Sequence, residues 1–307
     1  MQRVLTTVTL LGLLVATAAA FAITERLKLT KSSVYGTQVS RYLAPGCQCA
    51  TSKATVRIKL RHTGHVTVTI ANSAGHEIAT IGSDVLMRAG VPKAFPWDGR
   101  TDAGVMAPDG VYYPWVHLPR RTLRFLNRIT LDTKAPKVLS ASLGKPVLFA
   151  GPGNTIAIKY TLSEKAHAVV YLGRHRIIQS RLRHERDKVK WAGTLAGSPL
   201  PAGTYDLSVA AEDLAGNVTP AAERKHVSVV VRYIQLAPER ITAHSGRRFA
   251  VHVQTAAARY TWRLGRRHGR HRGKVLHLQA PTTPGTYRLV VSEDGHTTTA
   301  VVRVRGK

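Results

Sequence analysis

One short phrase occurs three times in this 307-residue chain, and it constrains the fold more than any other feature. Each copy has a glycine, a tyrosine two residues later and a valine four residues after that, with a proline just upstream. The tyrosines are 93 and 82 residues apart, an interval that fits a whole small β-domain and is too long for a solenoid repeat. Proline and glycine favour a turn, and the tyrosine then begins a strand and packs on its core face. The copies contain Gly110 and Tyr112, Gly203 and Tyr205, and Gly285 and Tyr287.

Apolar residues alternate with other residues at a period of two along much of the chain. This pattern is typical of strands with one buried face. Outside the N-terminus no long segment shows a helical apolar period, so the sequence predicts an all-β protein of two or three domains. Clear examples of the alternation are residues 56–60, 66–70, 156–160, 205–209, 227–231, 249–253 and 260–264.

The N-terminus predicts export. Arg3 precedes an uncharged apolar run over residues 4–24, and Ala18 and Ala20 offer a small-x-small cleavage site. The run also just reaches the length of a membrane-spanning helix. We therefore interpret residues 1–24 as a signal peptide or an uncleaved membrane anchor, with the anchor slightly favoured. The expected location is extracytoplasmic, either anchored through residues 4–24 or secreted and held in the cell wall.

Residues 25–49 are expected to form a polar stalk that holds the only cysteines, Cys47 and Cys49. Three interpretations remain open for them: a strained bridge between the two, bridging to another molecule, or free thiols. Zinc binding is the weakest option because no partner pair of Cys or His residues lies nearby. We expect both cysteines at the surface, because Pro45 and Gly46 flank them.

The first domain is expected over residues 50–134. It holds Trp97, Asp98, Gly99 and Arg100, then Asp102, Gly104, and finally the Gly110–Tyr112 phrase. Together with the upstream Val66–Ile70 segment, this pattern resembles the Ig-like domain of the flagellar hook-capping protein FlgD, which also occurs in many secreted bacterial proteins. The resemblance covers about a quarter of the chain. It implies a β-sandwich module and not the hook-capping role, because no hook-assembly region precedes it.

Two further domains are expected over residues 136–232 and 233–307. The middle one repeats the tryptophan–glycine pair as Trp191 and Gly193, and its segment from Asp213 to Asn217 is similar to a hairpin of secreted Ig-like repeats. The junction at 129–136 resembles linkers between tandem bacterial Ig-like domains. The predicted fold class is therefore all-β, with tandem Ig-like β-sandwich domains behind an N-terminal hydrophobic signal or anchor helix.

Motifs for catalysis are missing from the sequence. It contains no nucleophile elbow, HExxH zinc motif, P-loop or dinucleotide-binding glycine pattern. Asp98, Asp102 and Asp109 could in principle bind calcium, but Asp-Gly turns explain them without a metal. We therefore expect no enzyme activity, no metal and no cofactor.

Positive charge is the other strong signal, with a formal net charge of +28. Its densest cluster is predicted as an exposed hairpin loop over residues 266–274. One interpretation is an anion-binding site for teichoic acid, phospholipid head groups, acidic polysaccharide or extracellular DNA; the alternative is a solvated basic loop without a ligand. Specific nucleic-acid binding is disfavoured, since aromatic residues form only 6% of the chain. The cluster comprises Arg263, Arg266, Arg267, Arg270, Arg272 and Lys274.

These observations favour a non-catalytic structural or binding protein of the bacterial cell surface. The alternative is a secreted adhesin or cell-wall binder whose basic C-terminal hairpin holds an anionic polymer. The expected partner is such a polymer or another surface protein. The sequence does not specify the ligand or the oligomeric state.

Overall fold

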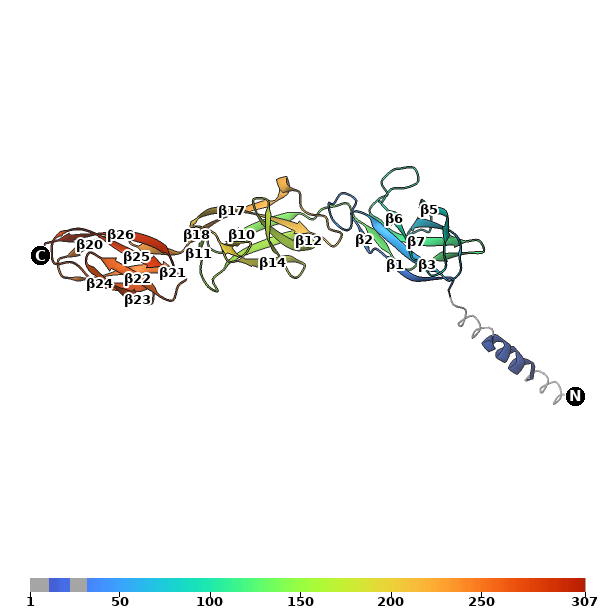
Figure 1. Cartoon of the computed structure of the whole chain (residues 1–307), viewed down its shortest axis with the longest axis horizontal. Helices are drawn as coiled ribbons and strands as arrows, with labels where there is room; N and C mark the ends of the chain where they lie inside the picture. The colour runs from blue at the N-terminus through green and yellow to red at the C-terminus, as the bar shows by residue number, and fades with distance from the viewer. Residues whose placement is uncertain (1–10, 23–31, 307) are drawn as a thin grey trace. The chain divides into compact units, whose positions relative to one another are not determined.

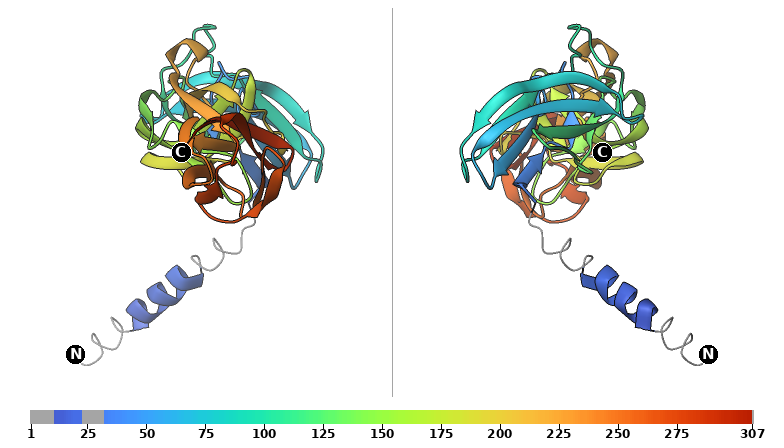
Figure 2. Two further views of the ribbon diagram at one scale, coloured as in Figure 1. Left: turned by 90° about the vertical axis from the view of Figure 1, so that its left-hand side faces the viewer. Right: turned by 90° about the vertical axis from the view of Figure 1, so that its right-hand side faces the viewer.

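A computed structural model describes residues 11–22 and 32–306 (Figure 1). The chain divides into two compact units, one ending at Thr133 and the other beginning at Lys134. Residues 11–22 form a helix, drawn in blue in Figure 2. Within the described residues no helix is long and apolar enough to cross a membrane. The remainder of the expected 4–24 segment lies outside the described residues.

The first unit is a sandwich of a three-stranded and a six-stranded sheet around one hydrophobic core. Alternate residues of β3 and β4, such as Val56, Ile58 and Val68, are fully buried between the sheets, as their period of two predicts. One sheet contains β1 (Val34–Val39), β3 (Ala54–Leu60) and β6 (Lys93–Trp97); the other contains β2 (Tyr42–Leu43), β4 (Gly64–Asn72), β5 (Glu77–Met87), β7 (Gly110–Leu118), β8 (Arg121–Arg124) and β9 (Ile129–Leu131).

Part of the expected stalk belongs to this sandwich. Strand β1 pairs with β3, β2 pairs with β9, and Leu43 is completely buried. The prediction of a stalk through residue 49 is therefore wrong from residue 34 onward. The segment is too short to show a clear alternation of apolar residues, and its strands are determined by pairing with strands elsewhere in the chain. Cys47 and Cys49 form a disulfide with each other in the loop after β2, with Cys49 exposed.

The second unit contains two hydrophobic cores, and the first of them lies within residues 138–233. Its long strand β12 belongs to both sheets: the first half pairs with β10 and β14, and the second half pairs with β13 and β17. The elements are β10 (Val138–Leu143), β11 (Val147–Phe149), β12 (Ile156–Leu172), β13 (His175–Gln179), β14 (His184–Trp191), β15 (Thr194–Leu195), β16 (Ser198–Pro199), β17 (Gly203–Glu212), the 3-10 turn η1 (Ala221–Glu223) and β18 (Lys225–Arg232).

The other core, within residues 234–304, lies between sheets of three and five strands. This region has eight strands. The three-stranded sheet contains β19 (Ile234–Ala237), β21 (Arg248–Thr255) and β24 (Val275–Gln279); the five-stranded sheet contains β20 (Arg240–His244), β26 (His296–Arg305), β25 (Gly285–Glu293), β22 (Tyr260–Leu264) and β23 (Arg267–His271).

The three sandwiches share one connectivity. In each, an early strand crosses to the second sheet and pairs in parallel with the last strand: β2 with β9, β11 with β18, and β20 with β26. The remaining pairs in the two main sheets of each sandwich are antiparallel, and the two sheets enclose a common core, as in immunoglobulin-like domains. The prediction of an all-β chain with Ig-like sandwiches is confirmed.

Candidate functional site

The repeated phrase forms the same hydrogen bond in all three sandwiches. The tyrosine hydroxyl donates to the carbonyl oxygen four residues upstream: Tyr112 to Pro108 at 2.6 Å, Tyr205 to Pro201 at 2.8 Å, and Tyr287 to Thr283 at 2.8 Å. Each tyrosine lies near the start of the strand that pairs antiparallel with the last strand of its sandwich: β7 with β9, β17 with β18, and β25 with β26. This is the tyrosine corner of Ig-like folds. Tyr112 is buried, whereas Tyr205 and Tyr287 are half-buried and pack against their cores.

A buried tryptophan accompanies the tyrosine in the first two sandwiches. The Trp97 indole donates to the carbonyl of Arg100 at 2.8 Å, and the Trp191 indole donates to that of Thr194 at 2.9 Å. Both rings meet their tyrosine edge-on, with centroids 5.1 Å apart for Trp97 and Tyr112 and 6.3 Å for Trp191 and Tyr205. These contacts explain the recurring spacing of tryptophan and tyrosine as a packing requirement.

The glycine two residues after each tryptophan is required by the backbone. Gly99 and Gly193 have φ of +88° and +76°, which disfavour residues with a side chain. A Cβ at Gly99 would also lie 3.0 Å from the Pro45 side chain, and one at Gly193 would lie 3.1 Å from Leu148. The predicted motif residues are therefore placed where they define the fold.

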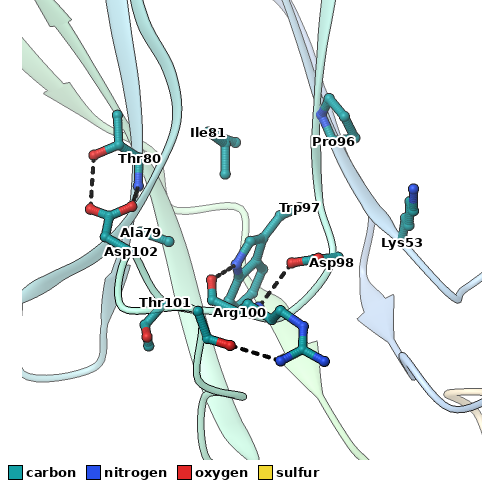
Figure 3. Close-up of a pocket in the computed structure, with 11 residues that line it drawn as sticks. Lys53, Ala79, Thr80, Ile81, Pro96, Trp97, Asp98, Arg100, Thr101 and Asp102 are labelled. Carbon is teal, nitrogen blue, oxygen red and sulfur yellow. Dashed lines mark hydrogen bonds between the residues drawn. The ribbon is translucent and has the colours of Figure 1, made fainter.

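The loop after Trp97 borders a hollow of about 480 Å³ in the first unit (Figure 3). The carboxylates of this loop are already hydrogen-bonded to the protein. Asp98 accepts from the amide of Arg100, and Asp102 accepts from the amide and hydroxyl of Thr80 on β5. The Arg100 guanidinium donates to the carbonyl of Gly104 at 2.7 Å. These bonds stabilise the loop and leave little for a ligand to replace.

The remaining acidic motif residues also stabilise turns and junctions. Asp109 accepts from the amide and hydroxyl of Thr133, and Asp213 accepts from the amides of Gly216 and Asn217. Gly216 has φ of +95°, a backbone conformation that favours glycine, and the segment forms an Asx-type turn around Asp213. Within the described residues no three His, Cys, Asp or Glu side chains gather in a way that could hold a metal ion.

The basic cluster of the third sandwich lies on an edge strand and its flanking turns. The prediction of one loop over residues 266–274 is wrong, because residues 267–271 form β23, which pairs with β22 through a two-residue turn at Gly265 and Arg266. The strand could not be predicted from the sequence because β23 consists of Arg, His and Gly residues, which are not typical strand formers. All six predicted cationic side chains are exposed.

The register divides these six side chains among different surfaces. Arg263 and Arg270 alternate with the core-facing Tyr260 and Leu264, so both occupy the outer face of the five-stranded sheet. Arg267 instead donates to Gln279 of the opposite sheet. Arg266 lies in the turn, and Arg272 and Lys274 lie in the loop before β24.

A shallow hollow of about 370 Å³ lies at the outer-face end of this cluster. The residues that line it include Thr261, Trp262, Arg263, His268, Arg270 and Ser292. This hollow combines hydroxyl donors with two guanidinium groups, and arginine forks match the oxygens of phosphate or carboxylate.

Sequence reasoning missed other cations on the same face. Arg288 of β25 and Arg303 of β26 are exposed and lie at outward positions between buried neighbours. The alternation of valine with arginine over residues 302–305 indicates such a face. The sequence alone does not give the pairing that places β25 beside β22 and β26 beside β25.

Comparison with known proteins finds solved structures only. No family model matches the chain, and no curated protein matches it. The I67–I69 fragment of titin is similar, with a TM-score of 0.31, 13% identity, and coverage of 91% of this chain and 100% of that chain. The Bacteroides ovatus glucan-utilization protein SGBP-B, solved with a mixed-linkage heptasaccharide, is similar with a TM-score of 0.26 and 14% identity. The match covers 82% of this chain and 64% of that chain. Dscam1 isoform 4.4 is similar with a TM-score of 0.20 and 12% identity, and the match covers 89% of this chain and 73% of that chain. At such scores no argument rests on these likenesses.

Proposed function

We propose that the protein is an exported, non-catalytic, multi-domain Ig-like protein of a bacterial cell surface, and that its third sandwich binds an anionic surface polymer. The domains in this proposal are residues 32–134, 136–232 and 233–307, the first being of the FlgD type that the Trp97 motif resembles. Residues 4–24 direct export and tether the chain if they are not cleaved. This proposal joins the structural role expected from the repeats with the alternative of a cell-wall binder.

The observation that carries the proposal is the one-sided charge of the third sandwich. Its six clustered cations are exposed, and within the described part of the chain none of them pairs with a carboxylate. Residues 240–292 contain no Asp or Glu at all. Uncompensated positive charge on a surface attracts polyanions and is screened by salt.

Binding of the full chain to purified bacterial cell wall tests the proposal. We expect retention at low salt, release as salt rises, and loss of retention when the anionic polymers have been extracted from the wall. Equal binding to extracted and intact wall would overturn the polymer-binding role. Absence of binding to either wall would favour a spacer without a ligand of this kind.

A further inference from the structure

The five-stranded sheet of the third sandwich presents an outer face without a carboxylate. Its strands contain one acidic residue, Glu293, which is buried and accepts a hydrogen bond from the hydroxyl of Thr255. The outward positions between the cations are mostly hydroxyl residues. They include Thr242, Thr261, Thr286, Ser292, Thr297 and Thr299.

The strand registers align one basic residue from each of the five strands, four arginines and one histidine, into one row. Arg270 of β23 lies opposite Thr261, which lies opposite Ser292 of β25. Arg263 of β22 lies opposite Val290, two residues nearer the start of β25.

The row continues with the same step across the rest of the sheet. Arg288 is itself two residues before Val290, and Arg303 of β26 lies opposite Thr286, two residues further. His244 of β20 lies opposite Arg305, which extends the row by the same two residues. No register shift interrupts these pairings. Each step therefore crosses one strand and advances two residues, and every member is exposed on the same face.

The step has a predictable length. Neighbouring strands are about 4.8 Å apart, and a shift of two residues along a strand covers about 6.7 Å. The Cα atoms of successive members of the row are therefore roughly 8 Å apart. Four such steps span roughly 30 Å along the diagonal. The row, defined as Arg270, Arg263, Arg288, Arg303 and His244, thus crosses the whole sheet (strands β20, β26, β25, β22 and β23 in Figure 1). The hollow beside Arg263 and Arg270 lies at one end of it.

We propose that this row is the binding track for one extended phosphodiester polymer, with one phosphate per short repeat. The inference rests on the proposed function and specifies its site and ligand class. Each guanidinium can donate two parallel hydrogen bonds to the free oxygens of a phosphodiester, and the flanking hydroxyls can donate further bonds. An extended polymer with regularly spaced phosphates can contact several guanidinium groups at once.

The face disfavours ligands that need stacking. Trp262 lies on the inner side of the sheet edge, where a Cβ at Gly269 would be 3.1 Å from its indole nitrogen. The outer face therefore presents no aromatic platform for the bases of a single-stranded nucleic acid. Recognition instead depends on charge and hydrogen bonds, so binding must weaken steeply with salt.

Two triple variants of the full chain test the row at equal change of net charge. The row variant combines Arg263→Gln, Arg288→Gln and Arg303→Gln, and the control combines Arg266→Gln, Arg272→Gln and Lys274→Gln from the turn and loop. The probe is poly(glycerol phosphate) in titrations at several salt concentrations, with folding checked by circular dichroism. We expect the row variant to lose about tenfold or more in affinity and to reduce the salt slope by roughly 2, and the control to lose less than about threefold.

The possible failures separate the two proposals. Equal losses by the two folded variants would overturn the row and leave a general basic surface. A larger loss of affinity in the control would place the binding site in the turn and loop instead of the row. Stronger binding of the wild type to polygalacturonate or to anionic phospholipid vesicles than to the phosphate polymer would overturn the ligand class. If the wild type bound none of these probes, the proposed function would fail as well.

Discussion

The second and third sandwiches share their strand order and tyrosine corner but differ in the charges that they expose. In the second sandwich, some basic side chains are paired with carboxylates: His226 lies 2.7 Å from Asp206, and Arg176 forms an ion pair with Glu212. The outer face of the third presents cations with no carboxylate among them. Such uncompensated charge contributes no pairing energy to the fold. The features common to both regions therefore define the fold, and the difference supports the proposed binding face of the third sandwich.

The cores differ as well. The second sandwich buries Trp191 against Tyr205, whereas the third has no tryptophan at the matching position and holds Trp262 half-buried on β22, next to the edge strand β23. The second region therefore buries Trp191 together with Tyr160 in its core. The third buries Tyr260 but no tryptophan, and fills its core with aliphatic residues such as Leu264 and Leu276.

The largest expected effect tests this contrast in the cores. Trp191→Ala should destabilise the second sandwich by about 3–5 kcal/mol, because it removes a buried ring and leaves a cavity. Trp262→Ala is the matched control and should destabilise the third sandwich clearly less. Amide hydrogen exchange reports on each region separately. Equal loss of protection in the two variants would contradict the assignment of Trp191 as an anchor.

A pH dependence should distinguish the third sandwich from the second. Burial, with a smaller contribution from Asp294, raises the pKa of Glu293 to about 7 from its usual 4.5. The folded state therefore favours the protonated form. The contribution of the protonated Glu293 carboxyl to the free energy of unfolding is fully present below pH 4.5 and is lost as the pH rises through 7.

Thermal unfolding of the wild type and Glu293→Gln at pH 4.5, 6 and 8 measures this effect. The glutamine variant should lack this component of the pH dependence, and its melting temperature should exceed that of the wild type most at pH 8. An identical pH profile for the two proteins would show that the carboxyl is not protonated in the folded state.

Much of the fold follows from local pattern, whereas the site depends on pairing between distant strands. Alternating apolar residues predict most strands, and the turn chemistry of the repeated phrase locates the three sandwiches. The strands β1, β2 and β23 were missed because they are short or polar, and their partners determine their structure. The row from Arg270 to His244 joins residues from five strands. No local sequence pattern contains the registers that align them.

The tyrosine corner should have a moderate effect in all three sandwiches. Replacing the tyrosine with phenylalanine removes one hydroxyl hydrogen bond and should destabilise each sandwich by about 0.5–1.5 kcal/mol. Tyr112→Phe should have the largest effect of the three, because Tyr112 is buried and its Pro108 carbonyl would lose its partner. Denaturant unfolding with hydrogen exchange would measure the series. A change confined to one sandwich would contradict the equivalence of the three repeats.

The smallest effect is expected at the disulfide of Cys47 and Cys49. The bridge closes a loop of only three residues, so it restricts the unfolded chain little, and Cys49 is exposed outside the core. Changing both cysteines to serine should alter the stability of the first sandwich by less than about 1 kcal/mol. The neighbouring Leu43 is fully buried, so Leu43→Ala is a useful contrast and should destabilise the same sandwich by about 2–5 kcal/mol. Hydrogen exchange of β2 and β9 measures both variants, and loss of protection in the serine variant as large as in Leu43→Ala would show that the bridge is required to hold β2 in the sheet.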